Sequence, residues 1–286
     1  MTGEKSKMKP HFSRKLLAIP YAVFMLVFVV VPLVIVLYYA FTNDDGKFTF
    51  KYAGLFFTEN GTGLKAFFTS YTFKTIMQSF FISLMSTVIC LLIAYPVAYS
   101  IAHSKMKNKS MLLLLFIVPM WVNFVLRINA LKELFVFMGT YNKSDAWNIV
   151  NTIIGMVYDF LPFMILPIYT TIIKIDKSYL EAAKDLGATP AKAFLKVTLP
   201  LSKAGIASGI SMVFLPSMTN YVVSNYLTFR NVKILGKLID DYFAGDLWHD
   251  GSFIALLLLL FMFLITWATG GFKEDDISET RGTSLW

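Results

Sequence analysis

One carboxylate, Asp159, lies inside a long apolar stretch, ten residues after the stretch begins at position 149. Ten residues of helix extend about 15 Å, which is close to the middle of a bilayer if the stretch spans one. A carboxylate at that depth costs on the order of 2.5–3.5 kcal/mol, so it needs a charged partner or a water-filled path. Carboxylates and aromatic rings attract organic cations, and the aromatic residues next to Asp159 are Tyr158, Phe160 and Phe163.

Two interpretations of Asp159 remain open from the sequence. In the first, Asp159 lies on a path for a cation. The further residues that we expect along such a path are Trp121, Asn123 and Tyr169. In the second interpretation, Asp159 forms a structural ion pair with Arg127 or Lys132, near the outer part of the preceding apolar stretch.

The other residue types that commonly carry chemistry are scattered. His11, His103 and His249 are far apart in the sequence, and Cys90 is the one cysteine. They show neither metal-ligand spacing nor a paired nucleophile and base. The sequence also has no GxxxxGK[ST] loop for binding nucleotide phosphates. We therefore expect no catalytic centre, metal site or cofactor in this chain.

The composition is that of a membrane protein. The chain has 286 residues, of which 56% are hydrophobic and 15% charged, and its mean hydropathy is +0.62. Soluble domains contain about 25% charged residues. The net charge of +8 is explained by loop lysines that orient the chain in the membrane, so nucleic acid is not an expected partner.

Six apolar segments reach the length of about 20 residues that a membrane-spanning helix requires. They are residues 16–41, 74–102, 110–128, 149–173, 204–224 and 252–272. None alternates with the period of a strand, so helices are predicted and a barrel is excluded. The prediction is an all-α membrane protein with about six transmembrane helices in one domain, residues 16–272.

The basic residues predict the orientation. With the N-terminus inside, most Lys and Arg fall on the inner side, and one short inner loop carries Lys105, Lys107 and Lys109 without an acid. This bias places both termini in the cytoplasm. The predicted cytoplasmic segments are then the tails 1–15 and 273–286 and the loop 175–203.

The loop 175–203 has the pattern of two short helices. Ser178 followed by Glu181 has the form of a capping box, and Gly187 suits the residue just after a helix end. Thr189 is then expected to cap a second helix, which Pro200 ends. Each helix has one apolar side, so the loop lies on lipid headgroups or docks against a cytoplasmic partner.

The spacing within this loop resembles a known family. "EAA", three residues, "G", nine residues and "VTLP" are similar to the EAA loop of inner-membrane permeases in binding-protein-dependent ABC importers. Val197 stands where that family prefers Ile. The resemblance implies a type I ABC importer (MetI-like) permease fold and a coupling helix that contacts an ATPase. The residues that it implies for coupling are Glu181, Ala182, Ala183, Gly187, Leu199 and Pro200.

Within that family, permeases for spermidine and putrescine are the most similar. The matching stretches are "LLIAYPVAYSIA", "FIVPMWVNFVLRINALKELF" and "IIGMVYDFLPFMILPIYTTIIKIDKSYLEAAKDLGAT". The resemblance implies polyamine cargo, a bacterial inner-membrane location and transport by alternating access. It also implies three partners: a cytoplasmic ATPase dimer that binds ATP and Mg²⁺, a second homologous permease and an extracytoplasmic substrate-binding protein.

Other functions remain as alternatives. The cargo of such an importer could instead be an amino acid, an oxyanion, iron or thiamine. An ion-driven transporter would predict inverted repeats or several ionisable groups within spans, and neither is evident. Four acids lie in the outer loop before the last span and form either a solvated face or a cation funnel. They are Asp240, Asp241, Asp246 and Asp250.

Overall fold

The described part of the chain is helical. The computed structural model describes residues 19–56, 68–104 and 108–268, and within them the only strand-like pairing is one bridge between Thr42 and Phe48. This confirms the predicted all-α class. The predicted tails 1–15 and 273–286, and the outermost residues of the first and last predicted spans, lie outside the described residues.

The helices follow one another in this order. The first span is α1 (Ile19–Met25), a π-helical turn (Leu26–Val30) and α2 (Val31–Phe41), after which come a 3-10 turn (Lys51–Phe56) and α4 (Tyr71–His103). Next are α5 (Lys109–Ile117), a 3-10 turn (Val118–Trp121), α6 (Phe124–Phe137) and α7 (Asp145–Ile172). The loop region holds α8 (Lys177–Asp185), α9 (Pro190–Ala193), a second π-helical turn (Phe194–Thr198) and α10 (Leu199–Leu201). The chain continues with α11 (Lys203–Thr219), α12 (Tyr221–Leu227), α13 (Leu235–Ala244) and α14 (Trp248–Ala268).

Four of the predicted spans are long apolar helices, and the other two are bent. The third predicted span, 110–128, is not one helix, because the chain turns by 91° between Trp121 and Phe124. The fifth, 204–224, follows a bend of 64° between Leu201 and Lys203, and its helix α11 ends at Thr219, before the predicted end of the span. Counting each bent pair once gives up to six spans in the described residues.

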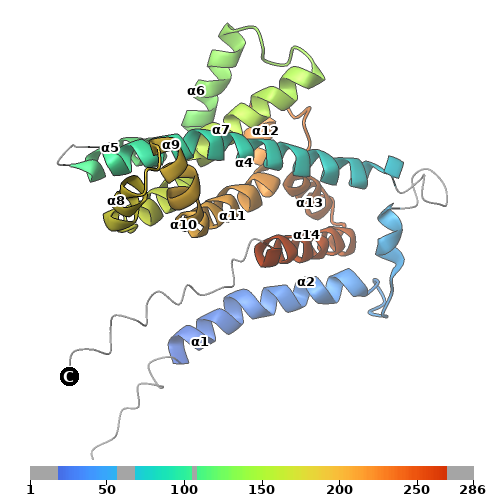
Figure 1. The fold of residues 1–286 in the computed structure, drawn as a ribbon. Coiled ribbons are helices and arrows are strands. Elements are labelled where there is room, and N and C mark those ends of the chain that lie inside the picture. The colour runs from blue at the N-terminus through green and yellow to red at the C-terminus, as the bar shows by residue number, and fades with distance from the viewer. Residues whose placement is uncertain (1–18, 57–67, 105–107, 269–286) are drawn as a thin grey trace, which may run out of the picture.

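Three helices form the centre of the molecule, α4, α7 and α11 (Figure 1). One buried face of α4 consists of small residues, namely Ser79, Ser83, Ser86, Cys90, Ala94 and Ala98. Small residues let helix backbones approach closely in a membrane. On α11, a Cβ added to Gly205 would lie 2.7 Å from the carbonyl oxygen of Pro167 in α7, so this crossing requires glycine.

A second layer is formed by α2 and α14, which run side by side along one edge of the molecule (Figure 1). Helix α13 joins this layer to the centre through buried apolar residues of α11, α13 and α14. The first span is exposed along nearly all its length. Its apolar surface is therefore available to lipid or to another membrane chain.

Each π-helical turn lies just before a proline. The turn 26–30 precedes Pro32, and the turn 194–198 precedes Pro200. Proline has no N–H to donate and its ring clashes with the carbonyl four residues earlier, and a wider turn relieves both problems. The second loop helix therefore includes Pro200 and ends one residue later, at Leu201, before the next span, close to the predicted end.

Candidate functional site

The first loop helix, α8, begins two residues earlier than the sequence pattern predicted. Asp176, not Ser178, is its N-cap, and an Asp176 carboxylate oxygen accepts a hydrogen bond from the Ser178 N–H at 3.0 Å. Both residue types cap helices well, so the sequence allowed either. Glu181 consequently lies in the body of α8 with an exposed side chain.

Helix α8 ends in the glycine turn that was predicted. Gly187 has a φ of +76°, its N–H donates to the Lys184 carbonyl at 2.8 Å, and the Ala188 N–H donates to the Ala183 carbonyl at 3.0 Å. This pair of bonds is a Schellman motif, in which the left-handed residue is usually glycine. Thr189 then caps α9 by accepting from the Lys192 N–H, as expected.

The second half of the loop is fixed to α4. The Phe194 ring packs edge-on against Tyr95 and Tyr99, with centroids 5.5 and 5.3 Å apart. The Tyr95 hydroxyl is 2.8 Å from the Ser202 hydroxyl in a buried hydrogen bond. The loop is therefore anchored to α4 at Phe194 and Ser202.

The first half of the loop exposes large apolar side chains. On α8, Tyr179 is 58% exposed and Leu186 is 89% exposed. Such apolar side chains on a short helix are typical of a docking surface. Of the residues that the resemblance implied for coupling, those on this surface or beside it are Glu181, Ala182, Ala183 and Gly187. Leu199 and Pro200 belong instead to the half of the loop that is fixed to α4.

Asp159 pairs with Arg127. An Arg127 guanidinium nitrogen lies 2.7 Å from the Asp159 carboxylate, and both side chains are less than one tenth exposed. The guanidinium also lies over the Tyr158 ring, 5.8 Å from its centroid. Arg127 and Lys132 were the two predicted partners of Asp159. Arg127 forms the ion pair, whereas Lys132 lies over the Tyr141 ring. The carboxylate is thus charge-compensated by a contact between α6 and α7.

The remaining path residues are not gathered in one place. Trp121 is 77% exposed, and Asn123 caps α6 by accepting from the Val125 N–H at 2.9 Å. Phe160 is buried and packs against Phe163. Tyr169 is buried near the end of α7, about 15 Å along the helix from Asp159. The contacts around the carboxylate are its ion pair with Arg127 and the Tyr158 ring under that guanidinium.

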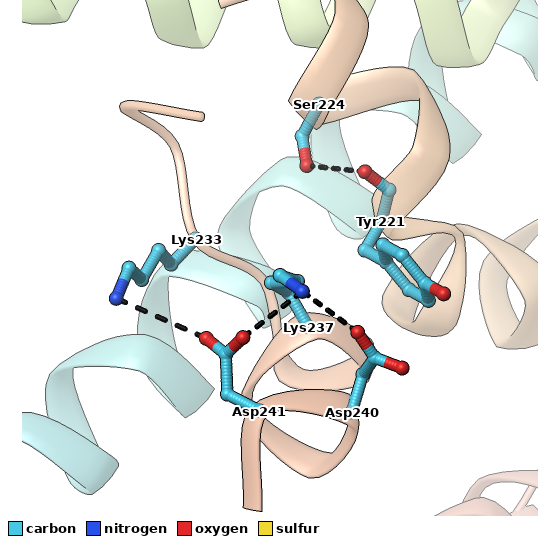
Figure 2. Close-up of polar contacts among 6 residues, drawn as sticks. All are labelled: Tyr221, Ser224, Lys233, Lys237, Asp240 and Asp241. Carbon is cyan, nitrogen blue, oxygen red and sulfur yellow. Dashed lines mark hydrogen bonds and ion pairs between the residues drawn. The ribbon is translucent and has the colours of Figure 1, made fainter. Parts of the chain in front are cut away.

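Two of the four outer acids, Asp240 and Asp241, belong to helix α13, where the sequence predicted a loop. Figure 2 shows the Lys237 ammonium of α13 between Asp240 and Asp241, at 2.7 and 2.9 Å, with Lys233 on the far side of Asp241 at 3.9 Å. The pKa of Lys237 is raised because its ammonium donates hydrogen bonds to both carboxylates. The signal was in the sequence, since spacings of three and four residues place opposite charges on one helix face. These two acids are compensated and do not form an open cation funnel.

Comparison with known proteins gives a consistent assignment. The family model described as "Binding-protein-dependent transport system inner membrane component" matches residues 94–272. The spermidine/putrescine transport system permease protein PotB of Haemophilus influenzae is 35% identical over 254 residues, which cover 84% of this chain and 87% of the relative. PotB of Escherichia coli K12 is 32% identical over 255 residues, covering 84% and 90%.

A solved structure supports the same fold. A chain of a bacterial alginate ABC transporter, crystallised in complex with an alginate pentasaccharide-bound periplasmic protein, superposes with a TM-score of 0.68. The superposition covers 90% of this chain and 92% of that chain at 13% sequence identity. This likeness confirms the predicted importer permease fold.

Proposed function

The chain belongs to the family of binding-protein-dependent transport system inner membrane components, and from this premise we propose that its cargo is a polyamine. It is a multi-pass membrane transport subunit and not an enzyme. The observation that supports a polyamine cargo is the 35% identity to a spermidine/putrescine permease over most of both chains. It sits in the bacterial inner membrane with both termini and the loop 175–203 in the cytoplasm.

A separate ATPase dimer, which binds ATP and Mg²⁺, docks on the first half of the loop. Glu181, Ala182, Ala183 and Gly187 form or border the contact, and the exposed Leu186 inserts into the ATPase surface. When the ATPase subunits close, they displace α8. The displacement reaches α4 because Phe194 and Ser202 are held by its tyrosines. Leu199 and Pro200 lie between Phe194 and the start of α11. Movement of the loop is therefore passed to α11 as well as to α4.

A second, PotC-like permease completes the path for the cargo. Tyr158 is 42% exposed and Trp121 77% exposed, so both aromatic faces are available on the surface that this partner covers. A polyamine ammonium at this site exchanges with the Arg127 guanidinium for the Asp159 carboxylate, and Tyr158 offers it a cation–π contact. Phe160 and Phe163 support the carboxylate from behind. Asn123 holds the bend that positions Arg127, and Tyr169 lies at the loop end of the path.

An external binding protein delivers the cargo, and competition for uptake tests which cargo it is. In bacteria that lack this chain, uptake of radiolabelled spermidine is expected to fall to background and to return when the chain is supplied. Unlabelled putrescine should compete, whereas lysine or arginine at the same concentration should not. Unchanged spermidine uptake in the deleted strain, with loss of uptake of another solute, would contradict the polyamine assignment.

A further inference from the structure

A cavity lies between the loop helix α8 and the ends of the membrane helices. Its volume is about 680 Å³, and its walls come from the C-terminus of α4, the N-terminus of α5, the last turn of α7 and one side of α8. The apolar side chains of the docking surface, Leu186 and Tyr179, do not line this cavity, although Glu181 borders both.

The charge of the cavity is positive. Lys177, Glu181 and Lys184 all line it from α8, because spacings of four and three residues place them on the same side of the helix. Lys109 adds a third ammonium from the start of α5, where its Nζ donates to the Ala102 carbonyl at the end of α4. Three lysines against one glutamate favour an anionic ligand.

A buried hydroxyl in the cavity wall also indicates a ligand. Thr198 is 1% exposed, lines the cavity, and its Oγ1 has no hydrogen-bond partner among the described residues. Nearly all buried polar groups in proteins are paired with protein, water or a ligand. An acceptor bound among the lysines would accept the hydrogen bond that Thr198 has to donate.

The surroundings favour a lipid over a soluble anion. Tyr169 and Ile172, in the last turns of a membrane-spanning helix, form part of the wall, which places the cavity at the level of the headgroups. Beside it, α5 carries the exposed apolar side chains of Met111, Leu114 and Leu115. Acyl chains can lie along this helix while a phosphate occupies the cavity.

We propose that the cavity between α8 and the ends of α4, α5 and α7 binds the phosphate of an anionic phospholipid. The lipid fills the space between the coupling helix and the membrane helices. Cargo identity plays no part in this proposal, and the lipid-binding test needs no ATPase, so the test can fail while the proposed function stands.

The test measures binding of phosphatidylglycerol to the full chain in detergent by native mass spectrometry, with phosphatidylcholine as the uncharged comparison. Replacing two lysines near an anionic headgroup should weaken binding about 30-fold. We therefore expect this loss for Lys177→Gln with Lys184→Gln. The matched control is Lys192→Gln with Lys196→Gln, in the same loop but outside the cavity, and it should bind as the parent does.

Two further variants separate this proposal from a loss of structure. Glu181→Gln removes the one acid that lines the cavity and should tighten phosphatidylglycerol binding several-fold. Thr198→Val keeps the side-chain shape, removes the unpaired hydroxyl, and should weaken binding without changing the helical content measured by circular dichroism.

Three outcomes would overturn the proposal. The first is equal affinity in the parent and in the Lys177/Lys184 variant. The second is equal binding of phosphatidylcholine and phosphatidylglycerol. The third is displacement of the lipid by millimolar inorganic phosphate, which would identify the ligand as a free anion.

Discussion

Replacing Gly187 by alanine isolates the role of the turn between the two halves of the loop. Gly187 has a φ of +76°, and a Cβ placed on it would meet no atom within 4 Å. The substitution therefore adds no clash within the chain and only the cost of a left-handed backbone, about 1–2 kcal/mol. That cost shifts the population of the native turn about 5–30-fold.

The assay is the ratio of cargo transported to ATP hydrolysed in vesicles that contain the chain and its partners. We expect Gly187→Ala to lower this ratio while ATP hydrolysis continues, because a turn that opens transmits less of the ATPase movement. Gly187→Asn should recover most of the ratio, since asparagine adopts the left-handed conformation more readily.

Gly139 provides the matched control. It also has a positive φ, +68°, with no atom within 4 Å of an added Cβ, but it precedes α7, whereas the loop follows that helix. Gly139→Ala carries the same backbone cost and should leave the ratio unchanged. An unchanged ratio in Gly187→Ala, or an equal loss in Gly139→Ala, would refute the role given to the turn.

Three other predictions concern particular contacts. Asp159→Leu should lower the free energy of unfolding by about 3–5 kcal/mol because it leaves the buried Arg127 charge unpaired, and adding Arg127→Met should restore most of it; equal stability of the single variant and the parent in denaturant unfolding would disprove the pair. Leu186→Ser should weaken ATPase binding in pull-down titrations by about tenfold or more, whereas Phe137→Ser, equally exposed at 89% but at the end of α6, should not; similar losses in both would argue against docking at α8. Gly236→Ala should destabilise the protein by about 1–3 kcal/mol, because its Cβ would lie 2.0 Å from the Thr219 carbonyl oxygen, and an unaltered melting temperature would show that α13 packs differently.

The sequence was informative where local chemistry decides structure. The long apolar runs predicted the helices, and the glycine and threonine between positions 187 and 189 predicted the loop turn. The capping-box pattern predicts Ser178 as the N-cap of α8, but Asp176 is also a good capping residue and forms the cap. A choice between two good caps two residues apart depends on how the chain leaves α7.

The bend after Trp121 and the ion pair depended on tertiary structure. Hydropathy continues through Val122 without a change, so the run reads as one span, and only Asn123 before the next apolar run signalled a new helix start. The sequence offers two basic partners for Asp159, Lys132 and Arg127, which lie 27 and 32 positions before it. The bend decided it, since α6 packs against α7 with Arg127, and not Lys132, facing the carboxylate.

The central claim is that this chain is one permease of an ATP-driven polyamine importer, and reconstitution tests it most directly. The measurement is uptake of radiolabelled spermidine into vesicles that contain this chain, the second permease and the ATPase, with the binding protein added outside. We predict uptake that stops when ATP, the second permease or the binding protein is omitted, and that unlabelled putrescine reduces. Uptake by this chain alone without ATP, or no uptake of either polyamine by the complete system, would contradict the account.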